Sequence, residues 1–114
     1  MNLHPGLPQS FEVLFQRYGQ KVVYCYECQV YHIHYGTVSL DLTEAAIANL
    51  IQTFQSYYKF YRGNVSPEHR CIEVDTPIHG FRLLLSPTDL REFGTMLESA
   101  VARYQERERQ RRLN

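Results

Sequence analysis

The sequence predicts an α+β domain in which two helices pack on one face of an antiparallel sheet of five or six strands. Three observations favour this class. Several short runs rich in β-branched and aromatic residues alternate apolar and polar positions, which is typical of half-buried strands. Two longer runs repeat apolar residues every three or four positions, which is typical of amphipathic helices. The chain has 114 residues, enough for one domain with a core of its own, and we expect residues 1–114 to form a single domain.

The first part of the chain favours strands. Residues 1–10 carry two prolines and a glycine and are expected to form a loose arm. Gly19-Gln20 and Gly36 are plausible turn positions between the strands that follow. Strands are expected at residues 11–18, 21–25, 30–35 and 37–42. Cys25 to Cys28 would then lie in the turn of a hairpin.

Capping residues and apolar stripes mark two helices. Thr43 is a suitable N-cap for a helix that extends to about Tyr61, and Ser86, Pro87 and Asp89 form a capping-box-like start for the second. Gly94 inside the second helix suggests close packing against a neighbour. The expected stripes are Ile47, Leu50, Ile51, Phe54, Tyr58 and Tyr61 in the first helix, and Leu90, Phe93, Leu97, Val101 and Tyr104 in the second.

Further strands are expected at residues 69–75 and 81–85, on either side of a Thr-Pro turn. Residues 105–114 are charged and lack a core stripe, so we expect a fraying or solvated helix end with internal ion pairs. Residues 36–61 and 79–104 align without a gap, and Thr43 then meets Ser86. This alignment favours equally a duplicated ββα unit and a chance likeness of two β-turn-helix segments.

The composition of the chain limits the kinds of partner that we expect the protein to bind. Lys+Arg and Asp+Glu both number 12, so the net charge is zero, and general nucleic-acid affinity, which requires excess positive charge, is not expected. No apolar run approaches the roughly 20 residues of a membrane span, and the N-terminal residues lack a signal-peptide pattern. We therefore expect a cytoplasmic protein that does not bind membranes. The odd number of cysteines, 3, fits a reducing compartment.

Cys25 and Cys28 are the first candidate site. Two cysteines separated by two residues in a hairpin turn have the spacing of a zinc knuckle, and His32 is the expected third ligand. Residues 28 and 32 of an extended strand lie about 13 Å apart, so His32 can join only if the intervening chain bends. The fourth ligand would be one of Cys71, His69 and His79. Packed, inert cysteines remain an alternative. A redox pair is less favoured, because a reactive Cys-x-x-Cys usually opens a helix and here a strand follows.

Tyrosines form the second candidate site. Tyr24, Tyr26, Tyr31 and Tyr35 lie on or beside neighbouring strands, where aromatic rings could stack unpaired bases. Few cations accompany them, so nucleic acid is unlikely and an interface or a core position is favoured. Residues 57–61 hold more aromatic rings than one helix face needs. Together with the zero net charge, these tyrosines predict a homodimer with Tyr31 and Tyr57 at its interface.

One combination of motifs resembles a family of small bacterial proteins. It consists of Cys25-x-x-Cys28-x-x-x-His32-x-x-x-Gly36, a Leu-x-Leu strand, Thr43 opening a helix, a Thr-Pro turn and Leu-Leu-Leu-Ser86. The resemblance covers about residues 20–104. Because the members of this domain family have no assigned activity, the resemblance implies a bacterial source and no functional residues.

The sequence contains no paired catalytic carboxylates, nucleophile motif or Gly-rich phosphate loop. The leading prediction is therefore a non-enzymatic binding or protein-interaction domain, with zinc as a candidate structural metal. One alternative is a thiol-dependent redox protein that uses Cys25 and Cys28. The other is a single-strand nucleic-acid binder that uses the tyrosines of the sheet.

Overall fold

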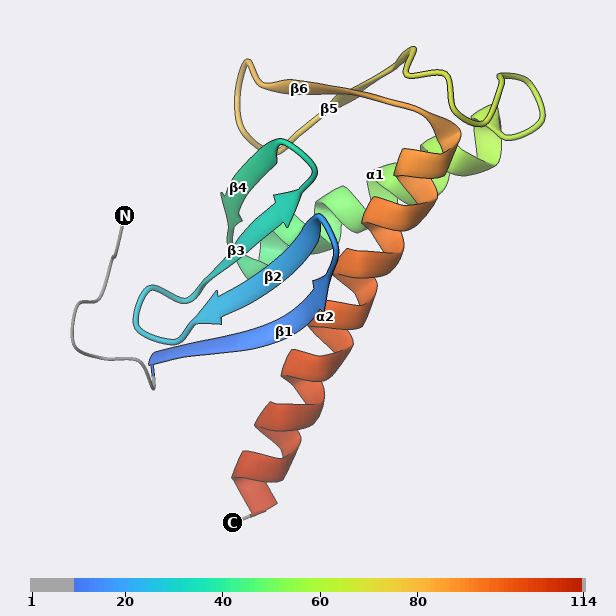
Figure 1. Cartoon of the computed structure of the whole chain (residues 1–114). Helices are drawn as coiled ribbons and strands as arrows, with labels where there is room; N and C mark the ends of the chain where they lie inside the picture. The colour runs from blue at the N-terminus through green and yellow to red at the C-terminus, as the bar shows by residue number, and fades with distance from the viewer. Residues whose placement is uncertain (1–9, 114) are drawn as a thin grey trace. The chain divides into compact units, whose positions relative to one another are not determined.

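The computed structural model describes residues 10–113 (Figure 1). These residues divide into two compact units. The first unit combines the chain up to residue 44 with the chain from residue 99 onward, and the second contains residues 45–98. Along the chain, the elements follow in the order β1-β2-β3-β4-α1-β5-β6-α2. The predicted α+β class is confirmed. The predicted loose arm lies outside the described residues, except for Ser10.

An antiparallel sheet of four strands, in the order β1-β2-β3-β4, forms the centre of the first unit. Gly19 and Gly36 occupy its two tightest turns with φ angles of 73° and 59°, a region that favours glycine. The strands are β1 (Phe11–Arg17), β2 (Gln20–Cys25), β3 (Val30–Tyr35) and β4 (Val38–Leu42). All four agree with the predicted ranges to within one residue.

Alternation along the strands decides which side chains reach the core. In β3, Tyr31 and Ile33 are fully buried, whereas His34 is exposed on the opposite face. The β1–β2 register shifts between Val13 and Phe15, which marks a β-bulge. Before the bulge, Glu12 lies opposite Tyr24 of β2. Directly opposed residues share a face, so the Glu12 carboxylate lies on the same face as Tyr24.

The second unit contains nearly all of α1 (Glu44–Tyr61), the strands β5 (Ile72–Asp75) and β6 (Arg82–Leu85), and the first part of α2 (Pro87–Leu113). Within residues 10–113, β5 and β6 pair only with each other, so the six strands form two sheets instead of the predicted single sheet. Each of these two strands has only four residues. Glu73 and Asp75 place charges along β5, a pattern that discourages pairing with a further strand.

Helix packing in the second unit follows the predicted stripes. Phe54 of α1 and Phe93 of α2 contact each other with ring centroids 4.9 Å apart. A Cβ atom added to Gly94 would lie 3.7 Å from the Cβ of Phe54, so this glycine lies directly against α1. The buried hydrophobic residues of the two helices are Ile47, Leu50, Phe54, Leu90, Phe93, Met96, Leu97 and Ala100, the last of which belongs to the first unit. The stripe of α2 is therefore broader than the sequence pattern indicated.

Helix α2 begins with the predicted reciprocal cap. The backbone N–H of Asp89 donates to the Ser86 hydroxyl at 3.0 Å, and the backbone N–H of Ser86 donates to the Asp89 carboxylate at 3.0 Å. Pro87 occupies the first helical position, where no N–H is needed. Arg70 adds a hydrogen bond to the same carboxylate at 2.7 Å. The start of α2 is thus fixed by side chains on both sides of the cap.

The other end of α2 is solvated, as one of the two predicted alternatives has it, because none of residues 105–113 is buried. The helix continues to Leu113, and the expected ion pairs form between Glu106 and Arg109 and between Glu108 and Arg111. Arg107 also pairs with Glu12 of β1, a contact that was not predicted.

The element order β-β-α occurs twice, as β3-β4-α1 and as β5-β6-α2. This order agrees with the predicted repeat, and duplication itself stays a prediction. No helix among residues 10–113 has the length and apolar content needed to cross a membrane.

Candidate functional site

Cys25 and Cys28 flank the turn between β2 and β3, as predicted. The backbone N–H of Cys28 donates to the Cys25 sulfur at 3.3 Å, and the N–H of Gln29 donates to the Cys25 carbonyl at 2.8 Å. Gln29 has a φ angle of 58°, a left-handed conformation that is uncommon for a residue with a side chain. This closed turn holds both cysteines as adjacent thiols, with Cys25 buried and Cys28 exposed.

The two thiols interact directly. A hydrogen bond with the Cys25 side chain raises the pKa of the Cys28 thiol, and desolvation and the Cys25 charge act in the same direction. A raised pKa lowers the fraction of thiolate at neutral pH, and the thiolate is the form that attacks disulfides. This weakens the thioredoxin-like alternative for Cys25 and Cys28.

The structure separates the predicted zinc ligands. The Nδ1 atom of His32 lies 2.7 Å from the Asp41 carboxylate, on the strand next to β3. Strand β3 is extended from Val30, so the chain makes no bend that would bring His32 to the cysteines. Among residues 10–113, no group of three or more His, Cys, Asp and Glu side chains is arranged to hold a metal ion. Cys71, His69 and His79 belong to the second unit. Zinc therefore stays a prediction.

Four tyrosines, Tyr24, Tyr26, Tyr31 and Tyr104, form a cluster in the first unit. The Tyr24 ring lies at its centre, with centroids 4.4 Å from Tyr104, 4.8 Å from Tyr31 and 5.0 Å from Tyr26. Three of these residues come from the β2–β3 hairpin, and Tyr104 comes from α2. This tyrosine cluster joins the sheet to the end of the helix.

Charged groups border the tyrosine cluster. The Tyr26 hydroxyl donates to the Glu12 carboxylate, which also pairs with Arg107. The guanidinium of Arg111 lies over the Tyr26 ring, 4.4 Å from its centroid, a cation–π contact. Sequence reasoning missed this network, because Glu12 and Arg107 are distant along the chain and no local pattern links them.

The tyrosine cluster corrects the predicted interface role of Tyr31. Its side chain is fully buried, and its hydroxyl has no hydrogen-bond partner among the described residues. Burial raises the pKa of both Tyr31 and Tyr24 above the ordinary range of phenols. Tyr24, Tyr31 and Tyr35 are all buried, so their rings are not accessible for stacking on bases. The nucleic-acid alternative therefore loses its binding surface.

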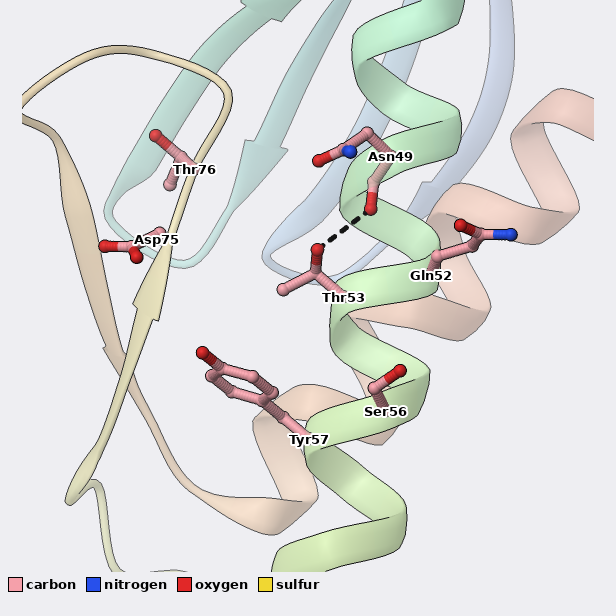
Figure 2. A pocket seen from close by; sticks show the side chains of 7 residues that line it. All are labelled: Asn49, Gln52, Thr53, Ser56, Tyr57, Asp75 and Thr76. Carbon is pink, nitrogen blue, oxygen red and sulfur yellow. Dashed lines mark hydrogen bonds between the residues drawn. The ribbon is translucent and has the colours of Figure 1, made fainter.

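A polar hollow lies between α1 and the end of β5 in the second unit (Figure 2). It has a volume of about 440 Å³ and is lined by Asn49, Gln52, Thr53, Ser56, Tyr57, Asp75 and Thr76. Several lining groups are already engaged. The Thr53 hydroxyl donates to the Asn49 carbonyl at 3.0 Å, and Arg82 donates to the Asp75 carboxylate at 3.0 Å. The predicted interface residue Tyr57 thus lies, half-buried, at the wall of a hydrophilic depression.

The outer side of the β5–β6 hairpin exposes apolar side chains. Leu84 on β6 is 59% exposed, and Ile78 and Phe81 in the connecting turn are 41% and 39% exposed. Leu83 and Leu85, the neighbours of Leu84, are buried on the other face. Composition does not distinguish the three consecutive leucines. Alternation along a strand places the middle one, Leu84, on the opposite face from its two neighbours.

Comparison with known proteins identifies no family for this chain. No protein-family model, curated protein or solved structure matches this chain. The resemblance to small bacterial proteins therefore stays a prediction, and the function must be argued from the geometry of the two units.

Proposed function

We propose that the protein is a non-enzymatic protein-interaction domain that forms a homodimer through the outer edge of β6. The single observation that carries this proposal is Leu84, an apolar residue that is 59% exposed on a strand with an open edge. Within residues 10–113, β6 has a hydrogen-bonded neighbour only on its β5 side. Open strand edges readily accept another strand, because their backbone groups are unpaired.

The hydrogen-bonding pattern of the β5–β6 hairpin supports the outer edge of β6 as the pairing edge. The N–H of Thr76 donates to the carbonyl of Phe81 at 3.3 Å, so residues 76 and 81 are a hydrogen-bonded pair. In an antiparallel ladder, hydrogen-bonded pairs alternate with pairs whose backbone N–H and C=O groups point away from the partner strand. The pairs that contain Arg82 and Leu84 are of this second kind. The backbone N–H and C=O groups of Arg82 and Leu84 are therefore directed toward the outer edge of β6.

A second copy of the chain fits this edge in one register. A twofold axis at Leu84 places Leu84 opposite Leu84 of the second copy, and the pairing ends before Ser86, whose backbone N–H is already bonded to Asp89. The same register places Leu83 opposite Leu85 of the second copy on the other face. No like charges meet, and the zero net charge of the chain adds no general repulsion. Apolar residues face each other on both sides of the new sheet.

The edge of β5 is a poorer partner for itself. Glu73 and Asp75 project from the same face of β5, so an equivalent twofold pairing centred on Val74 would bring carboxylates opposite each other. Like charges in opposed positions destabilise strand pairing. The charge pattern thus favours β6 over β5 as the dimer edge.

Light scattering of the full chain measures the association directly. At concentrations from ~1 to ~100 µM, we expect the mass to rise toward twice the 13.5 kDa of one chain. Leu84→Lys places a charge at the proposed axis and should hold the mass at that of one chain. Val13→Lys is the matched control, since Val13 is also an exposed branched aliphatic side chain on a strand, at 46%, and should leave the association unchanged.

Two results would overturn this proposal. One is a wild-type mass that stays at 13.5 kDa as the concentration rises. The other is a dimer that survives Leu84→Lys and dissociates with Phe60→Lys or Tyr57→Ala. Phe60 is 68% exposed at the end of α1, so this second pattern would assign the interface to the aromatic end of that helix.

A further inference from the structure

The turn between β2 and β3 has the features of a small metal-binding loop. Two thiols are adjacent, and one of the two sulfurs, that of Cys25, accepts a backbone N–H at 3.3 Å. The exposed Cys28 gives access from solvent, whereas the buried Cys25 keeps one side of the pair dry.

The number of available ligands selects the kind of metal. A structural zinc site needs four ligands, and the described residues contain no group of three or more suitable side chains. A pair of thiolates is instead sufficient for a soft ion of low coordination number, and thiolate ligands favour Cu⁺ among the biological metals. His32 is held by Asp41 at 2.7 Å and does not need to join.

We propose that Cys25 and Cys28 form a two-thiolate binding site for Cu⁺. On binding, each S–H bond breaks, two sulfur–copper bonds form, and the two protons pass to solvent, with no change of oxidation state. The site belongs to the first unit and does not depend on the proposed edge of β6.

Competition with a coloured Cu⁺ chelator tests the site. The tag-free, reduced full chain is titrated without oxygen into the copper-loaded chelator, and the loss of colour reports transfer. We expect transfer of one Cu⁺ per chain. Cys28→Ser should abolish it, and because Cys28 is exposed this variant should still fold. Cys71→Ser is the matched control, since Cys71 is also an exposed thiol, and it should retain full transfer.

Three results would overturn the proposal. The first is no transfer to the wild-type chain. The second is equal transfer to wild type and Cys28→Ser, and the third is loss of transfer in Cys71→Ser. A parallel titration with Zn²⁺ separates the tetrahedral alternative. One tightly bound Zn²⁺ per chain that is lost in His32→Ala would replace the Cu⁺ site with the zinc site expected from the sequence.

Discussion

Tyr31 shows most clearly how a single residue departs from its expected role. Its ring fills the core of the first unit, but its buried hydroxyl has no partner among the described residues. A buried polar group without a hydrogen bond is destabilising, because it has lost its contacts with water. The hydroxyl of Tyr31 therefore reduces the stability of the core that its ring fills.

Removing this hydroxyl should stabilise the protein. We expect Tyr31→Phe to raise the free energy of unfolding by about 1 kcal/mol, since the ring stays and the desolvated group is lost. Tyr26→Phe is the matched control, because the Tyr26 hydroxyl donates to the Glu12 carboxylate. It should lower the free energy of unfolding by about 1.5 kcal/mol. Urea denaturation of both variants checks these values, and a destabilised Tyr31→Phe would show that the hydroxyl is satisfied in solution.

Local patterns predicted the residues whose roles depend on neighbours in the chain. Ser86 and Asp89 form the expected cap, and Cys25 and Cys28 flank the expected turn. The sequence also placed Tyr31 in a strand, and left open whether it lies in the core or at an interface. It could not predict what covers this side chain, because the covering residue, Tyr104, is far away in the sequence. The position of a tyrosine in a strand therefore does not distinguish a core residue from an interface residue.

At the level of elements, the sequence pattern predicted the solvated end of α2 but not its contacts. The sequence after Gln105 is mostly charged, and none of residues 105–113 is buried. Arg107 and Arg111 nevertheless contact Glu12 and Tyr26. Long cationic side chains can cover aromatic surface while their charges stay near water, which hydrophobic periodicity does not detect. The separation of the strands into two sheets was missed for a related reason, because pattern identifies strands and not their partners.

Gly94 offers a test of the packing between α1 and α2. A methyl group at this position would lie 3.7 Å from the Cβ of Phe54, an ordinary contact distance. Alanine loses less backbone entropy than glycine on forming a helix, so Gly94→Ala should raise the free energy of unfolding by about 0.5 to 1 kcal/mol. Gly36→Ala is the contrasting control, because Gly36 has a φ angle of 59° and should be destabilised by a side chain. Thermal unfolding of both variants measures the difference, and a destabilised Gly94→Ala would mean that the helices pack more tightly than described.

At the level of the whole molecule, the two units depend on different interactions. The tyrosine cluster supports the first unit, whereas the contact between Phe54 and Phe93 lies in the second. The tyrosine cluster contains buried phenol groups, whereas the contact between Phe54 and Phe93 contains no titratable group. The stability of the two units should therefore respond differently to pH.

Alkaline conditions should destabilise the first unit selectively. Burial raises the pKa of Tyr24 and Tyr31 in the folded protein above the value of about 10 for an unfolded chain. The stabilising contribution of these groups is complete below pH 10 and is lost as the pH rises through their folded pKa values. Hydrogen exchange measured at pH 9 and again at higher pH should show that the opening of β2 and β3 accelerates more than the opening of α1. Equal acceleration in both units would contradict this prediction.

The division of the chain also has a consequence for its synthesis. Residues 10–44 emerge from the ribosome before residues 45–98, but the segment of α2 that carries Tyr104 emerges only after the whole second unit. The nascent hairpin therefore presents Tyr24 and Tyr31 uncovered while residues 45–98 are still being added. During this interval, at the usual elongation rates of ~5 to ~20 residues per second, we expect the uncovered aromatic surface to be prone to aggregation.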